Sequence, residues 1–495
     1  MSLEAVIGLE VHAQLLTQSK MFCSCRTIYG AEPNTQTCPI CLGMPGTLPV
    51  INRGAVELAI YTALALHCQI ATVSQFARKN YFYPDLPKGY QITQYQEPLA
   101  TNGFLKIKIN EVFKKIRINR LQLEEDAGKS LHSEDTKMLA RRPTCKVQGG
   151  EDSLVDLNRC GVPLMEIITE PDLRSPQEAK IFLLTLRQLL QYLEVCDGDL
   201  EKGSFRCDVN VSLRRSGTKE LGIRTEAKNL NSFRGVERTL LFEIERQRKI
   251  LESGGKIIQE TLQWDEKSEA ALPARSKEEA HDYRYFPEPD LVELQIDTNW
   301  VKNIEKKIPE LPEEIQERFK KTYKLPDYDV EILTQTKALA CYFEECVKQY
   351  PDAKIVSNWL MTEVLAILKE KKISLDNFLV KPIDLTEMFE LIEQGEITRT
   401  SAKTLFREMA KTGEKASLLR KKLGLGQISD AREIENIVEK VLQKQPEEIK
   451  RYLQGKTQLL TFFIGQIMKE TQGKADPKLV NEVLNKRLKE LAGKY

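Results

Sequence analysis

Alternating apolar and polar residues predict strands in the first 294 residues of the chain. In FRCDVNVSLR, residues 205–214, every second residue is apolar, and LGIRTEAKN, residues 221–229, spaces its charged residues in the same way. The polar side chains of the two segments are Arg206, Asp208, Asn210, Arg224, Glu226 and Lys228. A period of two is typical of a strand with one buried face. The polar face of this antiparallel sheet is either an ordinary solvated face or the floor of a binding site.

The segment VIGLEVHAQL, residues 6–15, predicts another strand of this kind near the start of the chain. Its apolar residues alternate with Glu10, His12 and Gln14. Residues two apart on a strand point the same way, so a carboxylate and an imidazole could bind one cation together. The alternative is an exposed face that carries a histidine by chance.

Helical periodicity replaces these short strands after residue 294. The segment IPELPEEIQERFKKTY has a proline and acidic residues where a helix begins. A softer boundary falls near Gly413, and amphipathic segments such as LLTFFIGQIMKET and KLVNEVLNKRLKEL follow it. We therefore predict an α+β fold: a large domain with an antiparallel β-sheet over residues 1–294, then two all-α domains over residues 295–412 and 413–495.

Composition indicates a globular protein, with 495 residues, 41% hydrophobic residues, 29% charged residues and a net charge of +1. The charge is unevenly distributed, because residues 413–495 contain 17 Lys and Arg against 11 Asp and Glu. A basic helical tail could bind RNA through its phosphates, although charged helix faces are often merely solvated.

Neither a signal peptide nor a membrane span is expected, because Glu4 comes early and the first apolar stretch is short. We therefore expect a cytoplasmic protein with no membrane partner. In that reducing compartment the eleven cysteines are not expected to form a disulfide framework.

Four cysteines lie close together in CSCRTIYGAEPNTQTCPIC, in a C-x-C-x12-C-x2-C arrangement. They are Cys23, Cys25, Cys38 and Cys41. Two close pairs of thiolates separated by a loop suit a structural zinc ion, since no coordination position is left open for catalysis. A redox pair or plain buried thiols are the alternatives.

Carboxylates in two other segments could complete a cation site. Glu166 has apolar neighbours on both sides in VPLMEIITEP, so its charge needs a cation or several donors. In LQLEEDAGKS, Glu124, Glu125 and Asp126 crowd acidic charge at the end of a strand. Oxygen ligands with one histidine favour magnesium or manganese, and hence a nucleotide or phosphate substrate. The alternative for Glu166 is an ion pair with Arg or Lys.

Any nucleotide must bind in a nonstandard site. AGKS, residues 127–130, is not a P-loop, because Leu123 stands where the leading glycine belongs. The segment RKNYFYPDLPKGYQITQYQ, residues 78–96, interleaves Lys79 and Lys88 with tyrosines and prolines. These aromatic residues could stack a nucleobase or line a substrate channel, or they could simply pack a loop onto the core.

Seven motifs in order resemble those of the GatB family, which supplies the B subunit of tRNA-dependent amidotransferases. They are GLEVHAQL, CPIC, ARKNYFYPDLPKGYQITQY, LEEDAGKS, VDLNRCGVPLMEIITEPD, RCDVNVSLR and RTEAKNLNSF. Towards the end of the chain, GQIMKETQGKADPKLVNEVL resembles the helical tail that this family shares with YqeY-like proteins. The resemblance therefore covers nearly the whole chain.

The resemblance implies that Glu on tRNA(Gln), Asp on tRNA(Asn), or both are amidated. In that reaction ATP activates the carboxyl group as an acyl phosphate, which ammonia then attacks. By similarity the magnesium ligands and catalytic residues are Glu10, His12, Glu125 and Glu166, whereas Glu124 fits the family role less well. Contacts to ATP are expected from Lys79, Lys88, Arg206 and Arg224.

Partner subunits are also implied, because the chain lacks an amidase-type nucleophile loop and a convincing Cys and His pair for glutamine hydrolysis. The family supplies an amidase-fold A subunit and a small C subunit in a heterotrimer. Ammonia passes through a tunnel, which the polar rows of residues 206–210 and 224–228 could line, and the two helical domains would hold the misacylated tRNA. The segment 131–153 looks longer than the usual link of the family, which leaves the role of His132 open.

Overall fold

A computed structural model describes residues 2–131, 154–228, 230–265, 269–275, 283–426, 431–471 and 473–492. His132 and nearly all of the long segment 131–153 lie outside these residues. The chain divides into two compact units, Met1–Pro312 and Glu313–Tyr495. Each unit is described by itself.

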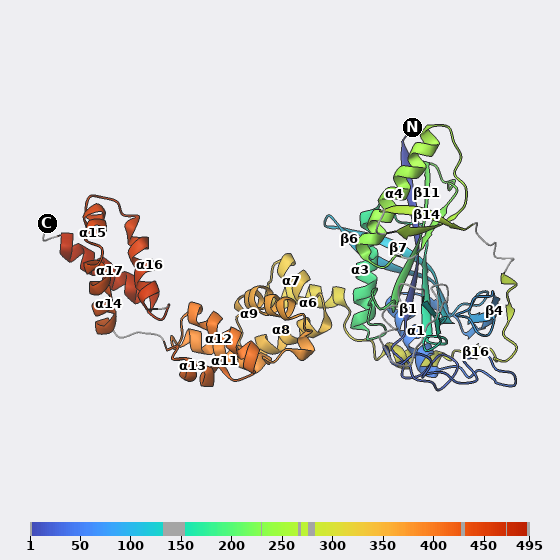
Figure 1. The fold of residues 1–495 in the computed structure, drawn as a ribbon, viewed down its shortest axis with the longest axis horizontal. Coiled ribbons are helices and arrows are strands. Elements are labelled where there is room, and N and C mark those ends of the chain that lie inside the picture. The colour runs from blue at the N-terminus through green and yellow to red at the C-terminus, as the bar shows by residue number, and fades with distance from the viewer. Residues whose placement is uncertain are drawn as a thin grey trace. The chain divides into compact units, whose positions relative to one another are not determined.

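The first unit is built on a sheet that has twelve strands in the described residues (Figure 1). The strand order is β14-β13-β12-β11-β1-β10-β7-β5-β4-β15, and β6 joins β7 to β2. All pairs are antiparallel except β12 with β13, which is parallel. The strands are β1 (Leu3–Gln14), β2 (Gln69–Ile70), β4 (Ala77–Asn80), β5 (Tyr90–Thr93), β6 (Ala100–Ile109), β7 (Val112–Glu125), β10 (Pro163–Thr169), β11 (Phe205–Arg215), β12 (Thr225–Lys228), β13 (Thr261–Asp265), β14 (Ala270–Arg275) and β15 (Phe286–Pro287). Two short pairs lie outside the sheet, β3 (Val73–Ser74) with β16 (Leu294–Gln295), and β8 (Lys129–Leu131) with β9 (Leu154–Asp156).

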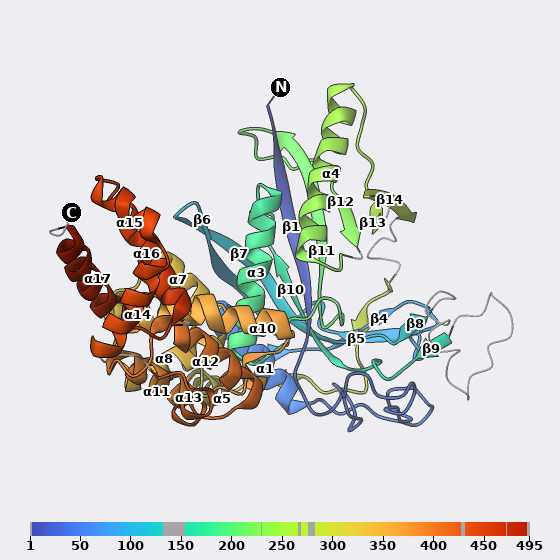
Figure 2. The same ribbon diagram turned by 60° about the vertical axis from the view of Figure 1, so that its left-hand side comes forward.

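Strand β1 lies in the middle of the sheet, and its alternation decides which face is buried. Ile7, Leu9 and Val11 are almost fully buried, and they share one hydrophobic core with residues of α1 (Arg53–Ala65), α3 (Pro176–Tyr192) and α4 (Phe233–Glu252). The three helices begin at side-chain caps provided by Asn52, Ser175 and Ser232. The helices therefore cover the apolar face, which leaves the polar face of the sheet for other uses (Figure 2).

The first unit continues past residue 294, where sequence patterning placed the first domain boundary. Helix α5 (Thr298–Glu305) contacts α1, and the indole of Trp300 donates a hydrogen bond to Glu57 across 3.1 Å. Residues 295–312 contain a short strand and a helix that are both anchored in the first unit. The boundary between the two compact units therefore falls at residue 312.

The second unit is helical throughout its described residues, so the predicted α+β class is confirmed. Phe319, Phe343, Phe389 and Phe406 are buried in its first part, while α14, α16 and α17 enclose a separate hydrophobic cluster that includes Ile434, Phe463 and Leu484. Among the described residues no helix is long and apolar enough to cross a membrane. The helices are α6 (Pro312–Tyr323), α7 (Asp327–Leu333), α8 (Lys337–Gln349), α9 (Ala353–Trp359), the π-helix η2 (Leu360–Val364), α10 (Leu365–Lys371), the 3₁₀-helix η3 (Leu375–Asn377), α11 (Pro382–Glu393), α12 (Arg399–Thr412), α13 (Ala416–Leu423), α14 (Ala431–Gln443), α15 (Pro446–Leu453), α16 (Leu459–Glu470) and α17 (Pro477–Ala492).

Candidate active site

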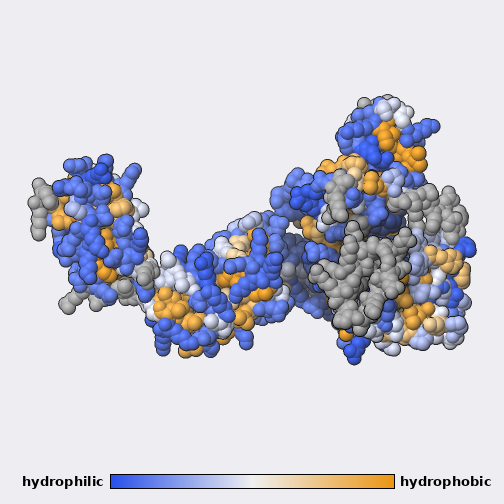
Figure 3. All heavy atoms as spheres, viewed as in Figure 1, coloured by the Kyte–Doolittle hydropathy of each residue, from blue (hydrophilic) through white to orange (hydrophobic). Residues whose placement is uncertain are grey.

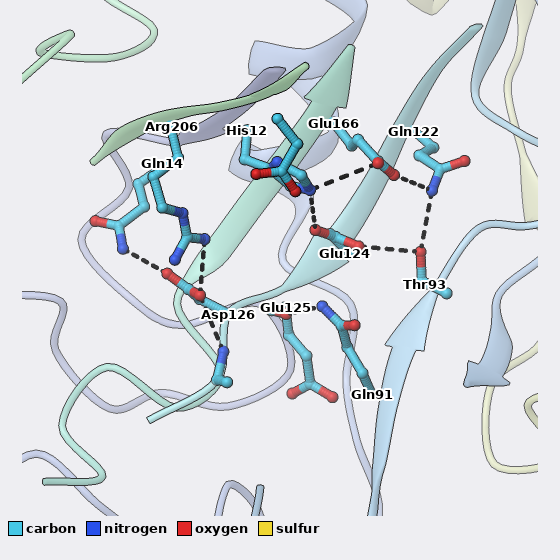
Figure 4. A network of polar contacts seen from close by, with 12 residues as sticks. His12, Gln14, Gln91, Thr93, Gln122, Glu124, Glu125, Asp126, Glu166 and Arg206 are labelled. Carbon is cyan, nitrogen blue, oxygen red and sulfur yellow. Dashed lines mark hydrogen bonds and ion pairs between the residues drawn. The ribbon is translucent and has the colours of Figure 1, made fainter. Parts of the chain in front are cut away.

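The registers of three neighbouring strands bring a histidine and two glutamates together on the polar face of the sheet. His12 on β1 is paired with Glu166 on β10, which is paired with Gln122 on β7. Glu124 follows Gln122 by two residues and therefore points to the same face. Figure 4 shows His12, Glu124 and Glu166 pointing toward one another from these three strands.

The ligand atoms of this cluster converge without direct hydrogen bonds between them. His12 Nε2 lies 3.6 Å from Glu124 Oε1 and 3.5 Å from Glu166 Oε1, and the three ligand atoms all lie within 4.8 Å of one another. Distances of this size are long for hydrogen bonds but suit atoms that surround one cation. Two carboxylates with one imidazole match the ligand preferences of magnesium and manganese.

Two neutral residues that sequence reasoning missed hold the outer oxygens of the two glutamates. Gln122 Nε2 donates to Glu166 Oε2 across 2.5 Å and to Thr93 Oγ1 across 3.4 Å, and Thr93 Oγ1 donates to Glu124 Oε2 across 3.4 Å. Because these bonds hold the Oε2 atoms, the Oε1 atoms of both glutamates face His12 (Figure 4). Gln122 could have been found from its position two residues before Glu124 on the same strand face.

Burial and mutual repulsion change the protonation of the cluster. Burial, reinforced by the charge of Glu166, raises the pKa of Glu124 to about 8. Burial, reinforced by the charge of Glu10, raises the pKa of Glu166 to about 7. Burial also lowers the pKa of His12 to about 4, so the imidazole is neutral at physiological pH and free to bind a cation.

These shifts predict how stability depends on pH in the metal-free protein. Above about pH 6.5 the folded state still holds protons on Glu124 and Glu166 that the unfolded state has released, and these outweigh the proton that His12 partly retains only in the unfolded state. The melting temperature should therefore fall as the pH rises from about 6.5 to about 8, and Mg²⁺ should raise it more at the higher pH. Melting curves of the wild type and the Glu124→Gln/Glu166→Gln variant test this, since the variant should lose both dependences.

Glu10 lies beside this cluster in a second acidic group with Asp208 and Glu226. Asn210 donates a hydrogen bond to Glu10 across 2.9 Å, and Lys228 Nζ lies 2.6 Å from Asp208 and 3.0 Å from Glu226. The charge of Glu10 acts on Glu166, so the two groups share the polar face. Glu10 is thus near the histidine cluster but belongs to a different group of side chains.

The structure does not bring Glu125 to the cluster, although sequence similarity placed it among the magnesium ligands. Adjacent strand residues point to opposite faces, so the side chain of Glu125 points to the face opposite that of Glu124. There its carboxylate pairs with Lys88 and accepts a hydrogen bond from the Ile92 amide across 3.0 Å. Glu124 takes the position in the cluster that was expected of Glu125, and the buried Lys88 is engaged by Glu125 instead of facing a nucleotide.

The Lys88 and Glu125 pair is expected to be structurally costly to break. Burial alone lowers the pKa of Lys88, but the opposite charge of Glu125 raises it above its usual value, so the lysine stays charged. Lys88→Met or Glu125→Gln alone leaves an unpaired buried charge and should cost about 3 kcal/mol of stability. The double variant should melt at a higher temperature than either single variant. Mn²⁺ binding should persist in Glu125→Gln and weaken in Glu124→Gln.

Of the other residues expected to contact ATP, Arg206 and Lys79 lie near the histidine cluster and Arg224 does not. Arg206 donates to Asp126 across 3.0 Å; Asp126 also binds Arg159 and Gln14. Burial alone would raise the pKa of Asp126, but the two arginines lower it well below its usual value. Lys79 lies 4.9 Å from the ring of Tyr283, and its charge acts on both glutamates of the cluster. Arg224 is exposed just before β12 and contacts neither acidic group within the described part of the chain.

The four predicted cysteines form one cluster, with sulfur atoms within 4.8 Å of one another. Lys20 is fully buried, and its Nζ lies 3.6 Å from Cys41 Sγ, while the Cys38 amide donates to the same sulfur across 3.2 Å. Hydrogen bonding with Cys23, aided by Lys20, lowers the pKa of Cys41 to about 4. Four sulfurs at this spacing, with a thiolate already favoured, fit a tetrahedral metal site.

Two family models match the chain. Residues 5–302 match the GatB/GatE catalytic domain, and residues 341–488 match the GatB domain. The chain belongs to the GatB family. The resemblance inferred from the sequence motifs is therefore confirmed.

Relatives of this family match the chain over its whole length. A protein of Thermodesulfovibrio yellowstonii is 54% identical over 490 residues, which is 99% of this chain and 100% of the relative. Proteins of Caldicellulosiruptor bescii and Persephonella marina are 50% and 49% identical, again over 99% of this chain and 100% of each relative. All three are named as the B subunit of aspartyl/glutamyl-tRNA(Asn/Gln) amidotransferase. His12, Glu124 and Glu166 all lie within the part that matches the family's catalytic domain.

Proposed function

We propose that this chain is the B subunit of a tRNA-dependent amidotransferase and carries the site where a carboxylate of misacylated tRNA becomes an amide. The convergence of three ligand atoms from His12, Glu124 and Glu166 carries this proposal. Full-length relatives named as such subunits support it. The substrates are Glu on tRNA(Gln), Asp on tRNA(Asn), or both.

The reaction needs activation because a carboxylate has no good leaving group. In the first step a side-chain carboxylate oxygen of the charged tRNA bonds to the γ-phosphorus of ATP, and the bond from that phosphorus to the bridging oxygen breaks, releasing ADP. In the second step the nitrogen of ammonia bonds to the acyl carbon. Phosphate then leaves with the electrons of its C–O bond, and the nitrogen gives up a proton to become the amide.

Each feature of the site geometry has a place in this scheme. Glu124, Glu166 and neutral His12 would hold Mg²⁺, which when bound neutralises charge on phosphate oxygens. Arg206, fixed by Asp126, and Lys79 offer cations for the transferred phosphate beside the cluster. Glu10 lies on the same face and can accept the proton that the attacking nitrogen releases.

Ammonia comes from a partner in this proposal. An amidase-type A subunit would hydrolyse glutamine, and a small C subunit would complete a cytoplasmic heterotrimer. The four-cysteine cluster would hold a structural Zn²⁺ ion that shapes the loop between β1 and α1. ATP, Mg²⁺ and Zn²⁺ are therefore the small molecules and ions assigned to this chain.

Amidation by the reconstituted complex tests the proposal. Glu-tRNA(Gln) and Asp-tRNA(Asn) are supplied separately, with glutamine and with or without ATP and Mg²⁺. We expect one ADP for each amide formed, and no amide without ATP. A complex that hydrolyses glutamine but forms no ADP when charged tRNA is added would instead make this chain a zinc-containing tRNA scaffold. The two charged tRNAs also reveal which substrate the enzyme uses.

A further inference from the structure

The hairpin of β6 and β7 extends beyond the rest of the sheet and carries a basic outer face. It projects from the sheet in both ribbon views (Figures 1 and 2), and the surface in that place is hydrophilic (Figure 3). Cross-strand partners share a face of a hairpin. The outward pairs are Phe104 with Arg117, Lys106 with Lys115, and Lys108 with Phe113.

This outer face continues the polar face of the candidate active site. The buried apolar residues of β7 are Leu121 and Leu123 near the site but Ile116 and Ile118 in the hairpin, so the buried apolar positions change from odd to even. All four belong to one hydrophobic core, and they therefore face the same side. The opposite side of β7 runs unbroken from Glu124 at the site to the lysines of the hairpin.

A β-bulge in β7 explains why the buried apolar positions change from odd to even. Pairing with β10 jumps from Arg120 to Ile118 and leaves Asn119 without a partner strand residue. On the neighbouring strand Asn102 has a left-handed backbone with φ of 55°. One extra residue in a strand reverses the alternation beyond it. Without this bulge the basic residues of the hairpin would point into the core.

The charges of this face are only partly neutralised by the protein itself. Arg117 pairs with Asp172 across 2.7 Å and Lys108 with Glu111 across 2.6 Å, but Lys106 and Lys115 form no ion pair within the described residues. The two lysines lie directly opposite each other, an arrangement that destabilises a hairpin unless an anion lies between them. Lys115 Nζ lies 3.8 Å from the centre of the Phe104 ring, so aromatic and basic groups are interleaved.

We infer that the outer face of the β6–β7 hairpin binds the phosphate backbone of RNA, namely the acceptor arm of the tRNA whose charged end enters the active site. This inference rests on the proposed function. From Glu124 to Lys115 the strand covers nine residues, or roughly 30 Å, so the lysines lie within reach of a duplex arm whose charged end is at the site. Because this basic face is continuous with the polar face of the active site, the tRNA that delivers its charged end there is favoured over an acidic protein surface.

Charge reversal at Lys106 and Lys115 tests the inference in the reconstituted complex. The Lys106→Glu/Lys115→Glu variant should bind tRNA at least tenfold more weakly at low salt, and its plot of log affinity against log salt should be shallower by about 2. The matched control is Lys219→Glu/Lys256→Glu, which makes the same charge change at two exposed positions outside the hairpin. Glutamine hydrolysis without tRNA should not change. Lys106→Ala/Lys115→Ala should show the same shallower slope without adding negative charge.

Three outcomes would overturn the inference. The first is a salt slope equal to that of the wild type, and the second is an equal loss of affinity in the control. The third is loss of assembly with the partner subunits in size-exclusion chromatography, which would make the face a protein interface. Failure of the proposed function is distinguished from all three, because it would appear as absence of amidation in the wild-type complex.

Discussion

Glu124→Gln and Glu166→Gln are each expected to lower the rate of amidation roughly a thousandfold, equivalent to about 4 kcal/mol of transition-state stabilisation. Both glutamates are buried and aim one oxygen at His12 Nε2, so either change removes a charged ligand atom from the cation site. The substitution keeps the side-chain shape, which limits the structural damage. Single-turnover amidation with saturating charged tRNA measures the effect.

Binding measurements separate this loss from misfolding. Both variants should bind charged tRNA as tightly as the wild type, while Mn²⁺ binding measured by electron paramagnetic resonance should weaken. Gln122→Leu should have a smaller effect on metal binding, because it leaves all three ligands in place and removes only the hydrogen-bond donor to Glu166. We expect a loss of about 10-fold to 100-fold in metal affinity there. Wild-type amidation rates in both glutamate variants would exclude the cluster as the reaction site.

Removal of zinc is expected to lower the stability of the protein strongly. The described chain between β1 and α1 forms neither a helix nor a named strand, and the four-cysteine cluster joins residues 23–25 to residues 38–41 within it. Structural zinc sites can contribute on the order of 10 kcal/mol to folding. Cys38→Ser, or treatment with a strong chelator, should lower the melting temperature of the complex by many degrees and expose this loop to protease.

Metal analysis provides the control for this prediction. The wild type should contain one zinc ion per chain, and Cys38→Ser should contain much less. Cys341→Ser alters an exposed cysteine outside the cluster and should keep both the zinc and the melting temperature. A wild-type protein that contains no zinc and is indifferent to the chelator would rule out a structural metal.

Local patterns predicted most of the secondary structure around the site. Alternation in residues 6–15 placed Glu10 and His12 on the polar face, and the spacing of the four cysteines anticipated their cluster. Alternation places adjacent residues such as Glu124 and Glu125 on opposite faces of a strand. It could not tell which of the two points to His12, because that depends on the pairing of β7 with β10. Gln122 and Thr93 were missed for the same reason, since neutral residues become informative only when their partners are known.

The sequence by itself determined the family, the α+β class, the polar face of the sheet and the cysteine cluster, because each depends on residue spacing along one segment. Only the tertiary structure decided that Glu124 and not Glu125 joins His12 and Glu166, that Glu10 belongs to a neighbouring group, and that a bulge turns the basic hairpin residues outward. These features depend on strand register. A shift of one residue reverses every side chain, and register is fixed by contacts between segments far apart in the chain.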